Sequence, residues 1–163
     1  MDWFAGYLML DALIGNTDRH HENWAVLERT DQAGRHASLA PSYDHASSLG
    51  RELKDDERSA RLEGKDRRRT VETYARRARS ALYRSPGDSR PLSPIDAFVE
   101  TMHRARGAGR LWLERLDGVG GDTLSGIVAR VPAERISDPA RRFAAALMAS
   151  NRRALLTLLE PRS

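Results

Sequence analysis

A short polar segment enclosed by two different apolar patterns is the feature that most constrains the fold of this chain. Residues 16–23 read NTDRHHEN. Before them, apolar residues recur at helical spacing over residues 3–14, and Gly15 followed by asparagine is typical of a helix end. After them, residues 24–27 and 35–39 predict the two strands of a hairpin. Because so short a hairpin is not stable alone, we expect the polar segment to join a helix and a hairpin that pack on one core.

The remaining sequence predicts further helices within the same domain. Helical patterns cover residues 70–81, 93–104, 111–113, 124–129 and 137–159. The chain has 163 residues, of which 40% are hydrophobic, and this is enough for one hydrophobic core. We therefore expect a single domain over residues 1–163, mainly α with a small β-hairpin.

The composition argues against several classes of protein. No apolar run approaches the roughly 20 residues that span a bilayer. The first helical pattern carries Asp2 and Asp11 and has no basic segment before it, so it does not resemble a secretory signal. The chain has no cysteine, which excludes a disulfide framework and a thiolate metal site. These features together predict a cytoplasmic protein without a membrane segment.

An arginine-rich block occupies residues 51–90. It holds 13 basic residues against 8 acidic ones, a local balance of +5 in a chain whose net charge is +4. A basic block can bind phosphates or nucleic acid. The acidic residues are interleaved throughout this one, however, so we do not expect direct binding of nucleic acid. We predict a long, solvated and partly mobile loop that contains helical pieces.

Asp18 and Asn23 suggest the chemistry of the polar segment. They lie five residues apart, and Asp44 follows the predicted hairpin. In phosphoryl transfer by protein kinases, an aspartate takes the proton of the acceptor hydroxyl and an asparagine five residues later holds a metal ion. Mg²⁺ prefers oxygen ligands, which a carboxamide on this loop and a carboxylate after the hairpin can supply. The order of helix, Asp–Asn loop, hairpin and aspartate is that of the C-terminal lobe of a kinase.

Two stretches of the sequence resemble the HipA-like serine/threonine kinases. They are NTDRHHENW at residues 16–24 and LAPSYD at residues 39–44. The YARRARSALYR stretch at residues 74–84 and the arginine pairs of the terminal helix also look like this family. The resemblance covers most of the chain and is sharp over residues 11–50. It implies the C-terminal lobe of a protein-kinase-like, HipA-like fold. The phosphatidylinositol kinases share a similar loop and are the nearest rival.

The resemblance also implies roles for individual residues. Asp18 would be the catalytic base, and His20 would brace the loop or lie beside the phosphates. Asn23 and Asp44 would bind Mg²⁺ and, through it, ATP. The implied reaction is phosphoryl transfer from ATP to a serine or threonine hydroxyl of a protein substrate. HipA-like kinases are often bacterial toxins paired with a DNA-binding antitoxin, so the resemblance implies such a partner as well.

The sequence departs from a complete kinase in one respect. A kinase also needs a glycine-rich loop over the phosphates and a lysine that pairs with them. No glycine-rich motif precedes Asp18, and both lysines, Lys54 and Lys65, follow it. We therefore expect the N-terminal lobe to be absent from this chain and to be supplied in cis or by a partner chain. The chain alone should show little or no turnover.

Other functions remain open at this point. The first alternative is a non-catalytic kinase remnant. Such a chain would act as an interaction module and would bind an acidic partner through the arginine-rich block. A fragment of a phosphatidylinositol-type lipid kinase is a lesser alternative. A zinc hydrolase is least favoured, because the adjacent His20 and His21 point apart and no third ligand has a zinc-site spacing.

Overall fold

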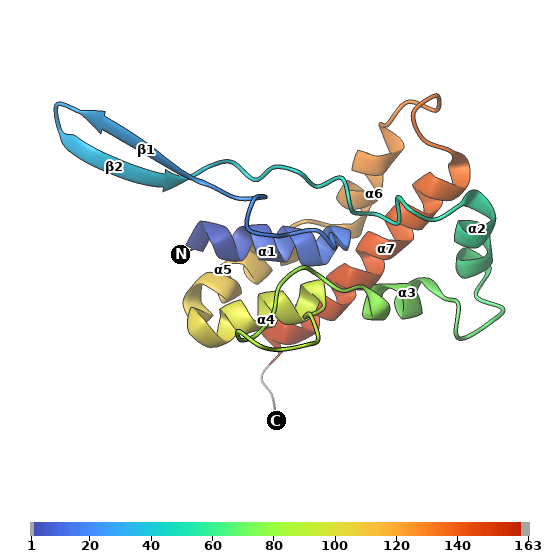
Figure 1. The fold of residues 1–163 in the computed structure, drawn as a ribbon. Coiled ribbons are helices and arrows are strands. Elements are labelled where there is room, and N and C mark those ends of the chain that lie inside the picture. The colour runs from blue at the N-terminus through green and yellow to red at the C-terminus, as the bar shows by residue number, and fades with distance from the viewer. Residues whose placement is uncertain (1, 161–163) are drawn as a thin grey trace.

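The computed structural model describes residues 2–160, with only the backbone of Asp2. A helical body carries one hairpin that projects from it (Figure 1). The elements are, in chain order, α1 (Asp2–Ile14), β1 (Val26–Asp31), β2 (Gly34–Leu39), α2 (Asp55–Glu63), α3 (Val71–Arg77), α4 (Pro94–Arg104), α5 (Arg106–Asp117), α6 (Gly121–Ala129), α7 (Asp138–Leu156) and the 3₁₀ turn η1 (Thr157–Leu159). The expectation of a mainly helical fold with one small hairpin is confirmed. None of the helices over residues 2–160 combines the length and the hydropathy needed to cross a bilayer.

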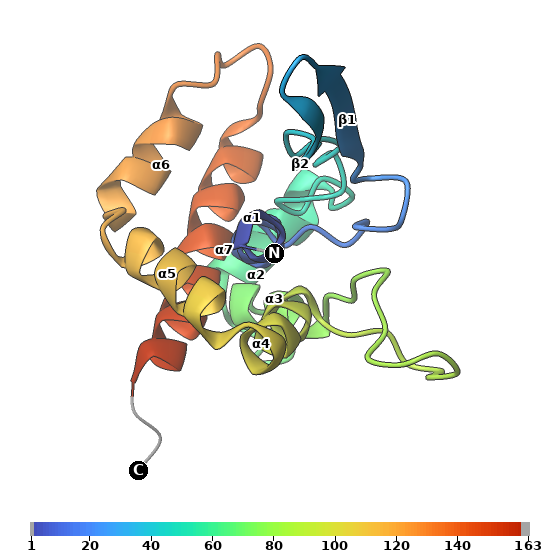
Figure 2. The same ribbon diagram turned by 90° about the vertical axis from the view of Figure 1, so that its left-hand side faces the viewer.

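Two helices, α1 and α7, organise the core. α1 has apolar residues all round its axis, and it packs against α4, α5 and α7. α7 runs through the body and contacts α2, α3 and α6 as well (Figures 1 and 2). The fully buried side chains at the centre of this packing include Phe98, Leu113, Phe143, Leu147 and Leu155. The apolar periodicity read from the sequence therefore predicted the main core helices correctly.

α1 ends where the sequence predicted, at Gly15. The backbone of Gly15 is left-handed, with φ 66°, which a glycine adopts without steric cost. The Asn16 N–H then donates to the carbonyl oxygen of Asp11 at 2.8 Å, which closes the last turn of the helix. The chain consequently leaves α1 sharply and enters the polar loop of residues 16–23.

The hairpin follows this loop and stands away from the core (Figure 1). β1 and β2 are antiparallel, with Val26 opposite Leu39 and Asp31 opposite Gly34. The strands are exposed along almost their whole length, and Val26 and Leu27 remain about half exposed (52% and 53%). The prediction of a hairpin is confirmed, but its first strand begins at Val26 rather than at residue 24. The expectation that the hairpin packs on the helical core is wrong, because its strands are exposed.

The arginine-rich block contains two helices. α3 lies within the range predicted for a helix, whereas α2 forms in a stretch for which no particular helix was expected. α2 begins with acidic residues, the Lys54 N–H donates to Glu57 Oε2 at 3.2 Å, and Gly64 ends the helix in the left-handed region. Arg58 and the Asp55–Ser137 hydrogen bond attach α2 to the body. These polar contacts stabilise a helix whose apolar pattern is weak.

The segment between the hairpin and α2 approaches α7 closely at Gly50. Gly50 has φ 69°, and a Cβ atom at this position would lie 2.4 Å from the ring of Phe143. Only glycine therefore fits here without a shift of the ring. This contact fixes the chain that leads away from the end of β2.

Candidate functional site

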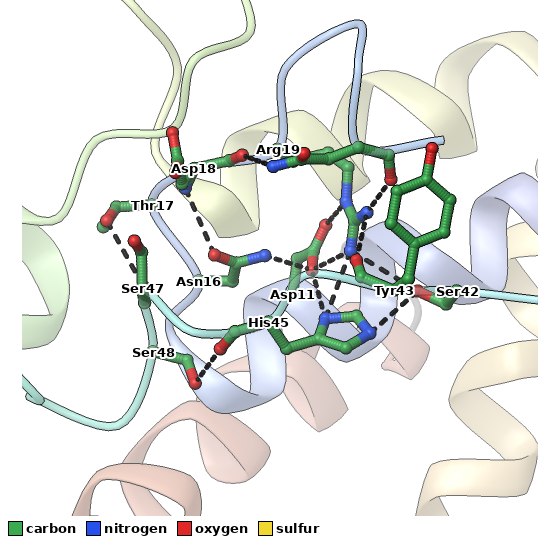
Figure 3. A network of polar contacts seen from close by, with 11 residues as sticks. Asp11, Asn16, Thr17, Asp18, Arg19, Ser42, Tyr43, His45, Ser47 and Ser48 are labelled. Carbon is green, nitrogen blue, oxygen red and sulfur yellow. Dashed lines mark hydrogen bonds and ion pairs between the residues drawn. The ribbon is translucent and has the colours of Figure 1, made fainter. Parts of the chain in front are cut away.

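A buried ion pair lies beneath the polar loop. The Nε of Arg19 is 2.7 Å from Asp11 Oδ2, and its Nη2 donates to Asp11 Oδ1 at 2.9 Å (Figure 3). The two side chains are only 1% and 3% exposed. The hydrogen bond with Asp11 raises the pKa of Arg19 above its ordinary value, and burial opposes this rise. The loop is thus fixed to α1 by a charged, bidentate contact.

Arg19 also joins the two polar segments of the site. Its Nη1 donates to the backbone carbonyl of Asn23 and to that of Tyr43, the latter at 3.2 Å. The Tyr43 hydroxyl in turn donates to the backbone carbonyl of Glu22 at 2.8 Å. The loop of residues 16–23 and the segment after the hairpin are therefore held side by side, as Figure 3 shows.

The loop itself is closed by two asparagine side chains. Asn16 donates through Nδ2 to Asp11 Oδ1 at 2.8 Å and accepts the Asp18 N–H at 3.2 Å. Asn23, also buried, donates through Nδ2 to the carbonyl oxygen of Asp18 at 2.6 Å. These contacts fix the backbone N–H and the backbone carbonyl of Asp18. The Asp18 side chain itself is half exposed. Since Nδ2 of Asn23 is the donor, its Oδ1 is the atom suited to a cation.

His20 occupies the turn between Asp18 and Asn23. Its Nδ1 accepts the Glu22 N–H at 3.3 Å, which requires the ring to be unprotonated at that nitrogen. Its Nε2 lies 3.9 Å from Asp18 Oδ1, beyond hydrogen-bond distance. This geometry agrees with a side chain that braces the turn beside Asp18.

Asp44 lies on the second segment in an unusual backbone conformation. Its φ is 53°, in the left-handed region that aspartate tolerates better than most residues, and the residue is exposed. Its negative charge helps to raise the pKa of Arg19, after the larger effect of Asp11. The two residues therefore interact electrostatically across the site.

His45 ties the same segment back into the buried network. Its Nδ1 lies 3.2 Å from Nη2 of Arg19 and 3.6 Å from Asp11 Oδ1, and its Nε2 lies 3.0 Å from the Ser42 hydroxyl. The Ser48 hydroxyl donates to the His45 carbonyl at 2.7 Å. The backbone next to Asp44 is thus restrained on both sides.

The oxygen atoms of Asn23 and Asp44 suit Mg²⁺ in chemical type. One amide oxygen and one carboxylate leave most of an octahedral shell to water and phosphate oxygens, which is how Mg²⁺ is commonly held in phosphate-transfer sites. Over residues 2–160, no three His, Asp or Glu side chains are grouped as they would be in an all-protein metal site. Asn23 and Asp44 are therefore candidate Mg²⁺ ligands by chemical type alone.

Sequence reasoning named Asp18, His20, Asn23 and Asp44 as candidate site residues and gave no role to several residues that hold them in place. The missed residues are Asp11, Asn16, Arg19 and His45. A signal for the first was present, because Asp11 is the single charged residue between residues 3 and 14, on a helix that is apolar all round. A carboxylate in that position needs a cation, and Arg19 is the first one after it.

Comparisons with known proteins support the fold. No family model matches the sequence, and no curated protein matches it. Among solved structures, the chain is similar to the crystal structure of a Helicobacter pylori proinflammatory kinase, CtkA, with a TM-score of 0.69 and 18% identity. The match covers 96% of this chain and 52% of CtkA, so the chain spans about half the length of that kinase. Residues 2–160 therefore have the fold of one part of a kinase, while membership of the HipA-like family stays a prediction.

Proposed function

We propose that this chain is the catalytic lobe of an ATP- and Mg²⁺-dependent protein kinase that phosphorylates serine or threonine hydroxyls. One observation carries the proposal: Arg19, paired with Asp11, holds the Asp18–Asn23 loop and the Asp44 segment together. Phosphoryl transfer depends mainly on positioning and charge, so a rigid arrangement of these three residues is the one the reaction needs. The kinase-like fold is consistent with this use of the site.

Each residue has a distinct role in the proposed reaction. Asp18, whose carboxylate is half exposed, accepts the proton of the acceptor hydroxyl. Asn23 and Asp44 supply oxygen atoms to Mg²⁺, and the bound Mg·ATP supplies the transferable phosphoryl group. His20 holds the turn so that the Asp18 carboxylate keeps its orientation. A lobe that covers the phosphates and offers them a lysine completes the site, in cis or from a partner chain.

The decisive experiment compares single aspartate variants in the presence of such a lobe. Asp18→Asn and Asp44→Asn should each abolish transfer of labelled phosphate from ATP to a protein hydroxyl. Asp122→Asn changes an exposed aspartate on α6 in the same way and should leave the activity intact. Full activity in the Asp18→Asn protein would exclude Asp18 as the base.

Nucleotide binding separates the kinase from a non-catalytic remnant. The wild-type chain should bind ATP more tightly with Mg²⁺ than without it, and Asp44→Asn should remove that difference. A chain that shows no Mg²⁺-dependent affinity even at millimolar ATP, with or without the second lobe, would instead be an interaction module.

A further inference from the structure

A basic cavity lies on the loop that joins α3 to α4. The cavity has a volume of about 450 Å³, and its lining includes Arg79, Arg84 and Arg90 together with Ser93 at the start of α4. The sequence around it is strongly biased in charge, since residues 76–90 contain five arginines and one acidic residue, Asp88. The catalytic roles proposed above use none of these side chains.

The loop that lines the cavity is on the same side of the molecule as the loop of residues 16–23. Figure 2 shows the loop of residues 79–93 and the loop of residues 16–23 on the right-hand side of the helical body, one below the other. Figure 1, turned by 90°, shows both in front of the body. A polypeptide that presents a hydroxyl to Asp18 therefore has the 79–93 loop as a neighbouring surface.

Backbone hydrogen bonds close the base of the 79–93 loop. The Ser80 N–H donates to the Leu92 carbonyl at 2.8 Å, and the Leu92 N–H donates to the Leu82 carbonyl at 2.8 Å. Arg84 is anchored to α4 by its Nε, which lies 2.7 Å from Glu100 Oε1. The cationic side chains are therefore carried on a closed loop, which lowers the entropy lost when a ligand binds.

The two acidic residues that line the cavity are already hydrogen-bonded within it. Asp88 accepts the Ser85 N–H at 3.1 Å, and Asp96 accepts the Ser93 hydroxyl at 2.7 Å. Arg79 donates to the backbone carbonyls of Arg76 and Ala78 rather than to a carboxylate. Arg90 has no carboxylate partner in the part of the chain that the structure describes. Arg84 is already paired with Glu100, so Arg79 and Arg90 are the guanidinium groups of the cavity that have no carboxylate partner among residues 2–160.

We infer that this cavity binds an acidic stretch of the protein substrate and so helps to select the hydroxyl that reaches Asp18. The inference rests on the proposed kinase function. Guanidinium groups bind carboxylates through paired hydrogen bonds, and Arg79 and Arg90 in one cavity can each receive an acidic side chain. A nucleic acid is a poorer match, because the cavity lining contains two aspartates and no aromatic side chain on which a base can stack.

Peptide binding, measured without ATP, tests the inference on the whole chain. A fluorescent ten-residue peptide with one serine and four glutamates is compared by anisotropy with the same peptide carrying glutamines. The acidic peptide should bind at least about tenfold more tightly, since one charge-assisted hydrogen bond corresponds to roughly that factor. Equal affinity for the two peptides would overturn the inference.

Matched arginine pairs locate the binding site. The double variant Arg84→Gln with Arg90→Gln should weaken binding of the acidic peptide about tenfold or more. The double variant Arg67→Gln with Arg68→Gln removes the same charge from the exposed turn between α2 and α3 and should change affinity by less than about twofold. An equal loss in both pairs would show non-specific attraction and overturn the site. If loss of the Arg84–Glu100 pair unfolds the Arg84→Gln/Arg90→Gln variant, the affinity of Arg90→Gln alone for the acidic peptide tests the site.

Two further measurements separate this inference from the proposed function. Asp18→Asn should bind the acidic peptide as the wild type does, because Asp18 does not line the cavity. A wild-type chain that binds this peptide but transfers no phosphoryl group to it when the second lobe is present would contradict only the kinase proposal. Transfer that treats acidic and neutral peptides alike would contradict only the cavity. A single-stranded oligonucleotide that displaces the peptide with equal or greater affinity would also overturn an acidic protein segment as the ligand.

Discussion

The guanidinium of Arg19 is paired with the carboxylate of Asp11 at 2.7 Å, in a place from which water is almost fully excluded. Arg19 belongs to the polar loop, and Asp11 belongs to the helix before it. The same guanidinium contacts the backbone on both sides of the hairpin. The pair therefore holds the two polar segments together in one site.

Replacing Arg19 should destabilise the whole chain. Arg19→Met leaves the Asp11 carboxylate buried without its cation, so the free energy of unfolding should fall by about 3–5 kcal/mol in urea denaturation. Arg19→Lys should restore little of it, because a single ammonium cannot reproduce the fork of donors. The control is Arg35→Met, which breaks an exposed pair with Glu28 and should change the free energy by less than about 1 kcal/mol. Similar losses in the two methionine variants would contradict the central role of the buried pair.

His45 should affect nucleotide binding without contacting the nucleotide. His45→Ala removes the contacts to Ser42 and Arg19 that restrain the backbone beside Asp44. Affinity for Mg·ATP should fall about 10- to 100-fold, the range found when a group that orients a metal ligand is removed. Isothermal titration measures this, with His36→Ala on the exposed hairpin as the control. Unchanged Mg²⁺-dependent affinity would show that the restraint has no functional effect.

Gly50 and Gly64 allow the effect of a steric clash to be separated from that of backbone strain. Both have a left-handed backbone, with φ of 69° and 64°, so alanine costs about 1–2 kcal/mol of conformational energy at either position. At Gly50 the added methyl also meets the ring of Phe143, whereas nothing lies within 4 Å of it at Gly64. Gly50→Ala should therefore lower the free energy of unfolding by about 1–3 kcal/mol more than Gly64→Ala. Equal effects in thermal denaturation would contradict the close approach to α7.

The attachment of α2 should weaken in acid. The hydrogen bond from Arg58, and then that from Ser137, hold the pKa of Asp55 below its ordinary value of 3.8. The folded state thus binds this proton less tightly than the unfolded state. The stabilising contribution is complete above pH 3.8 and is lost as the pH falls through the lower folded pKa. Carboxyl ¹³C titration should show a higher pKa in Arg58→Gln and in Ser137→Ala. Arg110→Gln, on α5, is the control and should not move it.

The sequence was informative where local chemistry decides the structure. The apolar residues at helical spacing and Gly15 predicted α1 and its end, and the strand-like segments 24–27 and 35–39 predicted the hairpin. Asp18, Asn23 and Asp44 were proposed as site residues because their spacing has a chemical meaning, and their roles stay predictions. The contact of His45 with Arg19 could not be predicted, because 26 residues separate the two and only the folded chain brings them together. α2 was missed for a related reason, since its apolar pattern is weak and it is stabilised by polar contacts to Gly50 and Ser137 and by the packing of Leu62 near Phe143.

The base of the hairpin suggests a practical use of this architecture. The Ala40 N–H donates to the Ala25 carbonyl at 2.9 Å, and Tyr43 closes onto Glu22 just behind it, while the turn at Gln32 and Ala33 lies at the far, exposed end. A sequence change at the tip of the hairpin should therefore leave the proposed ATP-binding residues in place. A short epitope tag or a fluorophore-binding peptide placed between Gln32 and Ala33 would report on the protein without altering the geometry at Asp18.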